Sequence, residues 1–174
     1  MAVLDLLYYP DEKLYQVSAQ VTEFNSELKQ LVDDMFETMY ADEGIGLAAP
    51  QIGVFKRIVV IDTVGEKKKE DQLVLINPEI ISSEGKTGIN EGCLSVPGLR
   101  GHVDRFEKIT VRAQNVTGEF FEKSADDLLA ICMQHEIDHL NGKLFIDYLS
   151  PLKRNLYRKK AKLLAKERER LKKQ

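Results

Sequence analysis

The chain has 174 residues, of which 43% are apolar, and its formal net charge is minus three at pH 7. This length is typical of one domain with one core, and no apolar run approaches the length of a membrane span. Two cysteines are too few for a disulfide scaffold, and the N-terminus lacks a basic segment before an apolar run, so we expect a cytosolic protein with free or metal-bound thiols.

The first half of the chain is predicted to combine one long helix with short strands. Asn25 or Ser26 is the expected N-cap residue of a helix, because apolar residues then recur at spacings of three and four until Gly44. Five runs rich in β-branched or aromatic residues are predicted as strands. They cover residues 57–62, 73–78, 79–82, 108–113 and 119–123. The turn residues at 115–118 predict a hairpin, so part of the sheet should be antiparallel.

Two helices are predicted in the second half. Ser124, with Asp127 three residues later, resembles a capping box, and Asn141 precedes a glycine that ends the helix after four to five turns. Ser150, followed by proline, predicts the start of a C-terminal helix. The sequence therefore predicts an α+β fold: a single compact domain with a mixed or antiparallel sheet around a central helix, plus a C-terminal helix.

The central helix contains the motif HExxH. His135 and His139 are four residues apart, so they project from one face about 6 Å apart along the axis and can converge on one metal ion. Glu136 lies beside them as a candidate base. The alternative is a helix whose histidines are ordinary surface or core residues. A catalytic metal site usually has three protein ligands and one position open to water, so a third ligand is required.

Four residues are candidates for the third ligand. Phe145 stands where one protease class has a third histidine, and phenylalanine cannot bind a metal. Glu167 lies deep in the basic tail. A metal between His135 and His139 would lie about 7 Å along the helix axis from Cys132, which a thiolate bond of about 2.3 Å cannot span. Cys93 remains, in the stretch EGCLSVPGL, which we expect to be an irregular or edge segment that approaches the helix. A thiolate with two imidazoles suits Zn²⁺ or Fe²⁺; the alternative is an inert cysteine in a turn.

A glycine-rich stretch, GIGLAAPQ, covers residues 44–51 and fits the pattern GxGxxA. A dinucleotide-binding loop with this pattern follows a strand and opens a helix. Here a predicted helix precedes the stretch and a strand follows it, so a dinucleotide site is not predicted. Taken alone, the stretch is a glycine-rich turn that ends in a glutamine.

Together, GIGLAAPQ, EGCLSVPG and QHEIDHLNG, in this order and spacing, closely resemble the three signature motifs of bacterial peptide deformylases. The resemblance extends to YPDEKL near the N-terminus and SPLKR before the tail, so it covers nearly the whole chain. It implies a compact α+β fold, a bound Fe²⁺ that Zn²⁺, Ni²⁺ or Co²⁺ can replace, and removal of the formyl group from the N-formylmethionine of new proteins.

The resemblance also implies a role for individual residues. It makes Cys93, His135 and His139 the metal ligands, in agreement with the elimination above, and it makes Glu136 the general base and acid. Coordination lowers the pKa of water to about 7, so a nucleophile becomes available at neutral pH. The departing nitrogen needs a proton, because an amine anion is a very poor leaving group.

Further residues are expected around the substrate. By the resemblance, the side-chain amide of Gln51 and the backbone N–H of Leu94 face the developing oxyanion, and Gly46 contacts the substrate backbone. Arg100 matches a basic position at the mouth of the family's site, although a solvated loop arginine is an equal alternative. The apolar pocket for methionine is expected to consist of Ile45, Ile89, Leu128, Ile131 and Cys132.

The C-terminal tail differs in charge from the rest of the chain. From residue 153 onwards, 11 Lys or Arg residues face only Glu167 and Glu169, which makes this tail plus nine and the remainder minus twelve. Its leucines fall on a narrow stripe, so we expect residues 151–174 to form a basic helix packed lightly on a catalytic metallohydrolase domain of residues 1–150. The resemblance suggests docking on ribosomal RNA near the exit of nascent chains; a solvated charged helix is the alternative.

Two other functions are compatible with parts of the sequence. A general metallopeptidase would also use HExxH, and it would cleave unformylated peptides. An RNA-binding protein with a structural metal would instead have a closed site with four ligands and no turnover.

Overall fold

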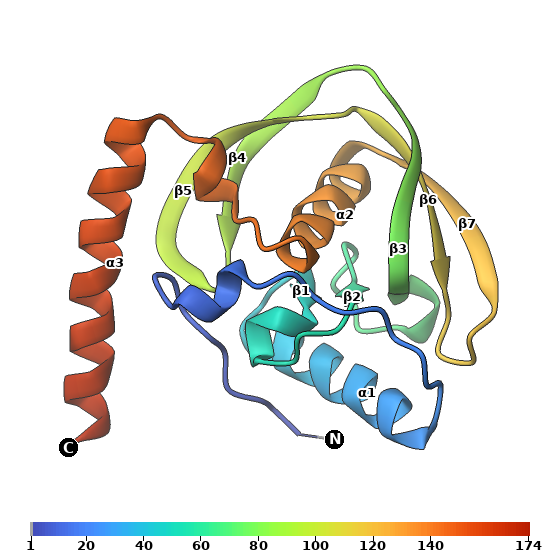
Figure 1. Ribbon diagram of the computed structural model, residues 1–174, viewed down its shortest axis with the longest axis horizontal. Helices are drawn as coiled ribbons and strands as arrows, with labels where there is room; N and C mark the ends of the chain where they lie inside the picture. The colour runs from blue at the N-terminus through green and yellow to red at the C-terminus, as the bar shows by residue number, and fades with distance from the viewer. Residues whose placement is uncertain (1) are drawn as a thin grey trace.

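The computed structural model describes residues 2–174, which form three α-helices, four short 3-10 helices and seven strands (Figure 1). The α-helices are α1 (Ser26–Ala41), α2 (Asp127–Leu140) and α3 (Pro151–Lys172). The 3-10 helices are η1 (Glu12–Tyr15), η2 (Ala49–Ile52), η3 (Lys69–Asp71) and η4 (Phe145–Tyr148). The strands are β1 (Gly46–Ala48), β2 (Ile58–Ile61), β3 (Leu73–Glu84), β4 (Thr87–Cys93), β5 (Val96–Arg105), β6 (Lys108–Gln114) and β7 (Phe120–Asp126).

The strands form two antiparallel sheets in the part of the chain that the structure describes. One has five strands in the order β1-β2-β3-β6-β7, and the other consists of β4 and β5. Helix α2 lies between the two sheets, and α1 lies on the far side of the larger one (Figure 1). The predicted α+β fold with a sheet around the HExxH helix is confirmed, and both sheets are antiparallel.

Strand β2 explains why this arrangement buries α2 so deeply. Its four residues are all buried, and successive side chains point to opposite faces of the sheet. Val59 and Ile61 belong to the cluster that packs on α2, together with Met133 of that helix. Ile58 and Val60 belong to the cluster that packs on α1. A sheet covered on both faces requires an unbroken apolar strand, which is the pattern that the sequence shows here.

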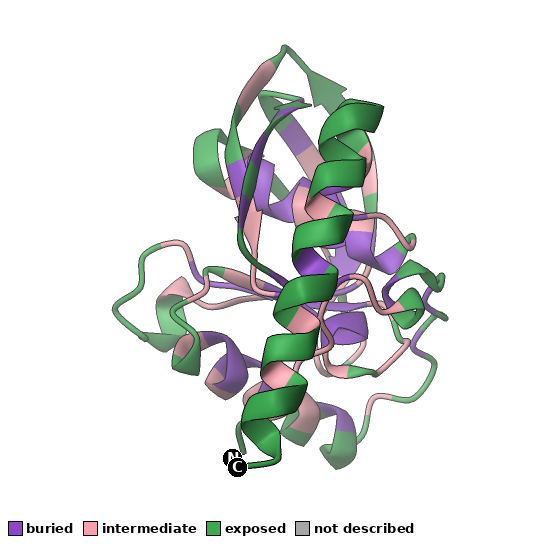
Figure 2. Cartoon of the chain, turned by 90° about the vertical axis from the view of Figure 1, so that its left-hand side faces the viewer, coloured by how far each residue is buried: buried purple, intermediate pink, exposed green. Residues whose placement is uncertain are grey.

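A third apolar cluster attaches the smaller sheet to the rest of the molecule. It joins β5 with η1, η4 and α3, and α3 contributes the buried Ala161 and the half-buried Tyr157. The leucine stripe of α3 does not face the body: Leu152 is 80% exposed and Leu163 is 66% exposed. Helix α3 therefore does pack lightly, but through the opposite face, and Figure 2 shows it largely exposed along the outside of the molecule. Within residues 2–174, no helix is long and apolar enough to cross a membrane.

Several predicted boundaries are confirmed. The Asn25 side chain accepts a hydrogen bond from Leu28 N at 3.0 Å and caps α1, although α1 ends at Ala41 rather than near Gly44. The hairpin at 115–118 joins β6 to β7. The hydroxyl of Ser150 caps α3 as predicted.

Other boundaries were predicted wrongly. Ser124 does not cap α2, because β7 continues to Asp126, which is the N-cap residue instead. Pairing with the neighbouring β6 extends β7 past the local capping signal. Strands β1, β4 and β5 were not predicted, because their glycines and charged residues hide the period-two pattern.

The two strands predicted at 73–78 and 79–82 are one strand, β3, with a shift of register after Ile76. Asn77 stands at this irregularity with φ of 52°, a left-handed conformation that asparagine tolerates better than most residues. Its side chain bonds Val21 N at 2.8 Å, Val21 O at 2.9 Å and Gln114 Oε1 at 2.8 Å. Asn77 therefore fastens the N-terminal segment to the sheet.

We predict that Asn77→Ala lowers the free energy of unfolding by about 2 to 4 kcal/mol, because it removes three hydrogen bonds of about 1 kcal/mol each and strains a left-handed position. Urea denaturation measures the change. The exposed Asn155 of α3 provides a control: Asn155→Ala should change the stability by less than about 0.5 kcal/mol. Equal stability of Asn77→Ala and the wild type would contradict the role of this side chain.

Candidate active site

Three candidate metal donors come together from two elements. Cys93 is the last residue of β4, whereas His135 and His139 lie on α2, and their donor atoms are all within 4.8 Å of one another. The Cys93 Sγ is 3.4 Å from Nε2 of His139. Around a tetrahedral zinc ion, a sulfur at 2.3 Å and a nitrogen at about 2.1 Å are roughly 3.5 Å apart, so the donor spacing fits a metal.

The other residues considered for the third ligand position do not belong to this donor group. Phe145 is buried, and its ring stacks on that of His135 with centroids 6.3 Å apart. Glu167 lies on α3, where it pairs with Arg170. Cys132 is not part of the donor group, and its Sγ lies 3.9 Å from the carbonyl oxygen of Ile45.

The position of Cys93 depends on an irregularity in the smaller sheet. The register of β4 and β5 shifts between Glu91 and Cys93, and Cys93 then pairs with Val96 across a tight turn. Such an irregularity bends a strand and redirects its side chains. The prediction of an irregular or edge segment is therefore confirmed, since this stretch is the irregular end of a hairpin in a sheet of two strands, both of which are edge strands.

Glu136 lies beside the donor group and is almost completely buried. Its Oε1 is 4.0 Å from Nε2 of His135 and 3.8 Å from Nε2 of His139. This oxygen has no hydrogen-bond partner within residues 2–174. Burial raises the pKa of the Glu136 carboxyl to about 7, and a carboxyl with such a pKa can both accept and donate a proton near neutral pH.

Gln51 holds its amide nitrogen toward the donor group. The Gln51 side chain is buried, and its Oε1 accepts a hydrogen bond from Ala48 N at 2.9 Å. The Nε2 donates to Ser95 Oγ at 3.1 Å and lies 3.5 Å from Cys93 Sγ. Because the oxygen is occupied by the backbone, the N–H group is the part of the amide that faces the site.

A cavity of about 710 Å³ opens beside these residues. Its lining includes Cys93, His135 and Glu136, but not His139, which is only 1% exposed and lies behind them. The cavity also brings together all the other predicted site residues. These are Ile45, Gly46, Gln51, Ile89, Leu94, Arg100, Leu128, Ile131 and Cys132.

Two of these lining residues, Cys132 and Arg100, have environments that define their part in the cavity. Burial raises the pKa of the Cys132 thiol well above its ordinary value, so this side chain is a neutral, apolar part of the wall. Arg100 is exposed, and its guanidinium donates to the carbonyl of Asn90 at 3.2 Å while it lines the cavity. Arg100 is thus exposed but anchored to the backbone of β4.

The sequence reasoning missed a buried polar group behind the site. Glu91 accepts a hydrogen bond from Nδ1 of His135 at 2.8 Å. Arg105 donates to both oxygens of Glu91, at 2.8 and 2.9 Å, and to Asp138 at 2.6 Å. Glu91 could have been proposed as a site residue from the sequence, because it lies two residues before the candidate ligand Cys93. No local pattern around Arg105 indicates its partners.

Two donors at the wall of an open cavity, a third directly behind them and a buried carboxylate next to them form the arrangement of a metal-dependent hydrolase. Comparison with known proteins identifies the kind. Residues 3–155 match the family model of polypeptide deformylase. The structure resembles that of a peptide deformylase from Legionella pneumophila, with 51% sequence identity, a TM-score of 0.91, and coverage of 97% of this chain and 99% of that chain.

Two other solved peptide deformylase structures are also similar to this chain. A peptide deformylase from Plasmodium falciparum is 36% identical, with a TM-score of 0.88 and coverage of 95% and 97% of the two chains. One from Ehrlichia chaffeensis is 40% identical, with a TM-score of 0.85 and coverage of 94% and 97%. The chain belongs to the polypeptide deformylase family. It is a metal-dependent hydrolase that removes the N-formyl group from nascent peptides.

Gly46 is predicted to tolerate no side chain. A Cβ at this position would lie 2.6 Å from Glu136 Oε2 and 2.8 Å from Cys132 Sγ. We predict that Gly46→Ala displaces the Glu136 carboxylate and lowers kcat/KM for formate release about 10²-fold, the cost typical of a 1 Å misplacement. Metal content should be unchanged, because no donor atom is touched. Full activity in Gly46→Ala would contradict this close packing.

Proposed function

We propose that the chain hydrolyses the formyl amide of N-formylmethionyl nascent polypeptides with Glu136 as the group that moves the proton. The observation that carries this proposal is the position of Glu136 Oε1, buried, without a partner in residues 2–174, and within 4.0 Å of both imidazoles. A carboxylate in this position serves no evident structural purpose. It is suited to a reaction in which a proton must be taken up and then released.

We propose Cys93, His135 and His139 as the ligands of one Fe²⁺ ion, which Zn²⁺, Ni²⁺ or Co²⁺ can replace. The spacing of the donors supports the site, and a thiolate with two imidazoles suits these metals better than Mg²⁺ or Ca²⁺. Burial and the neighbouring His135 lower the pKa of His139, which favours the neutral imidazole that metals bind. When bound, the metal polarises the formyl carbonyl and lowers the pKa of water to about 7.

In this mechanism, groups of the protein itself transfer the proton and donate hydrogen bonds to the oxyanion. Glu136 Oε1 accepts a proton from the attacking water and delivers it to the methionine nitrogen as the bond between carbon and nitrogen breaks. Gln51 Nε2 and the backbone N–H of Leu94 donate to the oxygen on which negative charge develops. Formate and a free amino terminus leave the site.

The proposed substrate position follows from the cavity lining. Gly46 on β1 contacts the substrate backbone, and Arg100 lies at the mouth of the cavity. The methionine side chain occupies the apolar part of the cavity, formed by Ile45, Ile89, Leu128, Ile131 and Cys132. A cavity of about 710 Å³ is large enough for this side chain together with the formyl group and the following residues.

We predict that Glu136→Gln lowers formate release from a formyl-Met dipeptide by about 10² to 10⁴-fold, because the amide cannot accept the proton. Anaerobic purification and elemental analysis should show that the variant retains its metal. An unformylated peptide should not be cleaved by the wild type. Wild-type activity in the metal-loaded variant would contradict the role of Glu136, and cleavage of the unformylated peptide would indicate a general peptidase.

We predict a different outcome for Gln51→Ala. Loss of one oxyanion donor should lower kcat by about 10² to 10³-fold with the metal retained. Steady-state kinetics should show the loss mainly in kcat, because the proposed contact forms in the transition state. Loss of the metal instead would mean that the Gln51 contact with Cys93 is structural.

We also propose that residues 1–150 form the catalytic unit and that the basic helix of residues 151–174 is appended to it and binds ribosomal RNA near the nascent-chain exit. The plus-nine charge of the tail and the exposure of α3 support this role (Figure 2).

We propose a cytoplasmic location, where nascent chains and a reducing environment are found; both cysteines are free in the structure.

Removal of the tail after Pro151 should weaken ribosome binding, but it also removes Tyr157, which donates to the backbone of Arg100 at 2.5 Å. A sharper variant changes the exposed Lys159, Lys162 and Lys166 to glutamate and keeps that contact. We predict that this triple variant binds ribosomes at least about 10-fold more weakly at low salt, with dipeptide turnover unchanged. Co-sedimentation measures binding, and equal sedimentation of the variant and the wild type would contradict the proposal.

A further inference from the structure

The two candidate histidine ligands are held differently. Nδ1 of His135 donates to Glu91, whereas Nδ1 of His139 has no partner within residues 2–174. A hydrogen bond to the second ring nitrogen fixes the tautomer and the orientation of an imidazole ligand. The orientation of His135 therefore depends on where Glu91 is held.

Arg105 holds Glu91 in place. Its side chain is 4% exposed and that of Glu91 is 3% exposed, so neither charge is in contact with much water. Two parallel hydrogen bonds, from Nε at 2.8 Å and Nη2 at 2.9 Å, fix the plane of the carboxylate. An isolated buried carboxylate would be costly, so the guanidinium both neutralises Glu91 and sets its direction.

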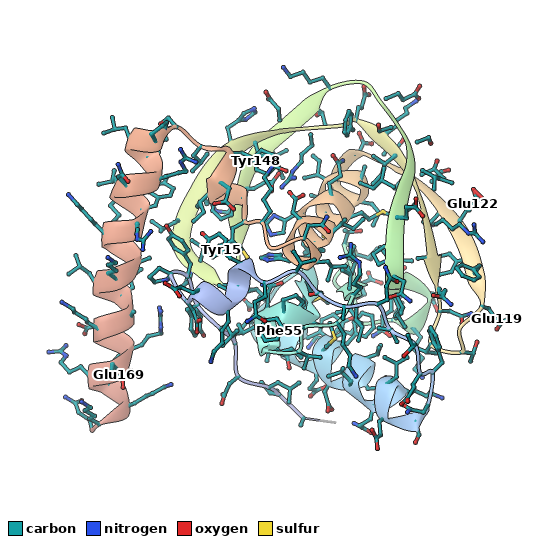
Figure 3. All side chains as sticks on the ribbon, viewed as in Figure 1. Tyr15, Phe55, Glu119, Glu122, Tyr148 and Glu169 are labelled. Atoms are coloured by element: carbon teal, nitrogen blue, oxygen red, sulfur yellow. The ribbon has the colours of Figure 1, made fainter. Side chains whose placement is uncertain are left out.

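Asp138 and Tyr148 complete this network on its outer side. Asp138 accepts from Arg105 Nη1 at 2.6 Å and from the hydroxyl of Tyr148 at 2.8 Å. The Tyr148 ring faces the Arg105 guanidinium at 4.9 Å from the ring centroid, and Lys143 lies 3.9 Å from the same centroid. Tyr148 is 41% exposed at the end of η4, close to the β4–β5 hairpin, so the network begins at the surface of the molecule (Figure 3).

We propose that Arg105, Asp138 and Tyr148 are positioning residues of the metal centre, which act through Glu91 on His135. The network connects the surface tyrosine to the imidazole by an unbroken series of hydrogen bonds and one bidentate ion pair. It holds Nε2 of His135 toward Cys93 and His139 before a metal binds. The proposal rests on the ligand set proposed above.

The test compares the affinity for Zn²⁺ of the wild type, Arg105→Lys, Asp138→Asn and Tyr148→Phe, measured by competition with a chromophoric chelator. Lysine keeps the positive charge but cannot form the two parallel bonds. We expect Arg105→Lys to bind Zn²⁺ about 10 to 100-fold more weakly, as is typical when a partner behind a metal ligand is lost. Asp138→Asn and Tyr148→Phe should show smaller losses in the same direction.

Tyr15→Phe is the matched control. Tyr15 is also 41% exposed and is labelled in Figure 3, but none of the hydrogen bonds described for residues 2–174 involves its hydroxyl. Its removal should leave the Zn²⁺ affinity unchanged. The absorption spectrum of the Co²⁺-loaded protein provides a second readout, because the d–d bands report the ligand geometry, and they should shift in Arg105→Lys but not in Tyr15→Phe.

The outcomes are distinguishable. A lower melting temperature of the metal-free variants, with Zn²⁺ affinity and Co²⁺ spectrum as in the wild type, would mean that the network is only structural and would overturn the proposal. If Arg105→Lys does not fold, Asp138→Asn and Tyr148→Phe decide in the same way. A wild type that binds no Zn²⁺, or a His135→Ala variant that binds it equally well, would overturn the ligand set itself.

Discussion

The site depends on the close approach of the end of β4 to one face of α2. Cys93 is separated from His135 by more than 40 residues, yet its sulfur lies 3.4 Å from an imidazole nitrogen of the next turn of that helix. Three features maintain this approach: the register shift before Cys93, the apolar cluster that includes β5 and η4, and the ion pair from Arg105 to Asp138. Each of these features constrains the distance between the thiol and the histidines.

Two buried glutamates near α2 have different environments, and this difference determines what each can do. Although burial alone raises the pKa of Glu91, hydrogen bonds from Arg105 and His135 lower it below the ordinary value. Glu136 has no such donors in the described chain, so burial raises its pKa to about 7. Neighbouring carboxyl groups whose environments push their pKa values apart commonly have different chemical roles. Glu91 remains a fixed acceptor, whereas Glu136 can exchange a proton.

The sequence predicted the elements that have strong local signals. The apolar periodicity after Asn25, the turn before Gly118 and the proline after Ser150 all depend on nearby residues, and each marks a boundary that the structure shows. The spacing of His135 and His139 likewise placed both on one face of α2. Their proximity to Cys93 was inferred by elimination and by the family resemblance, because no local pattern reports a contact between distant elements.

What the sequence did not predict depends on tertiary contacts. Strands β4 and β5 contain glycines and charged residues whose pattern has meaning only when the hairpin packs on α2. The capping signal at Ser124 was overridden by pairing with β6. The predicted break between strands after residue 78 is instead an irregularity within β3, where the side chain of Asn77 bonds other segments. The sequence around Arg105 does not distinguish it from a surface arginine of a strand, because its partners Glu91 and Asp138 come from other elements.

X-ray absorption spectroscopy of the metal-loaded protein tests the account most directly. The account predicts one sulfur neighbour at about 2.3 Å and two imidazole nitrogens at about 2.1 Å from the metal, with the sulfur signal lost in Cys93→Ser. A first coordination shell without sulfur, or one unchanged in Cys93→Ser, would contradict the convergence of β4 and α2 on one metal ion.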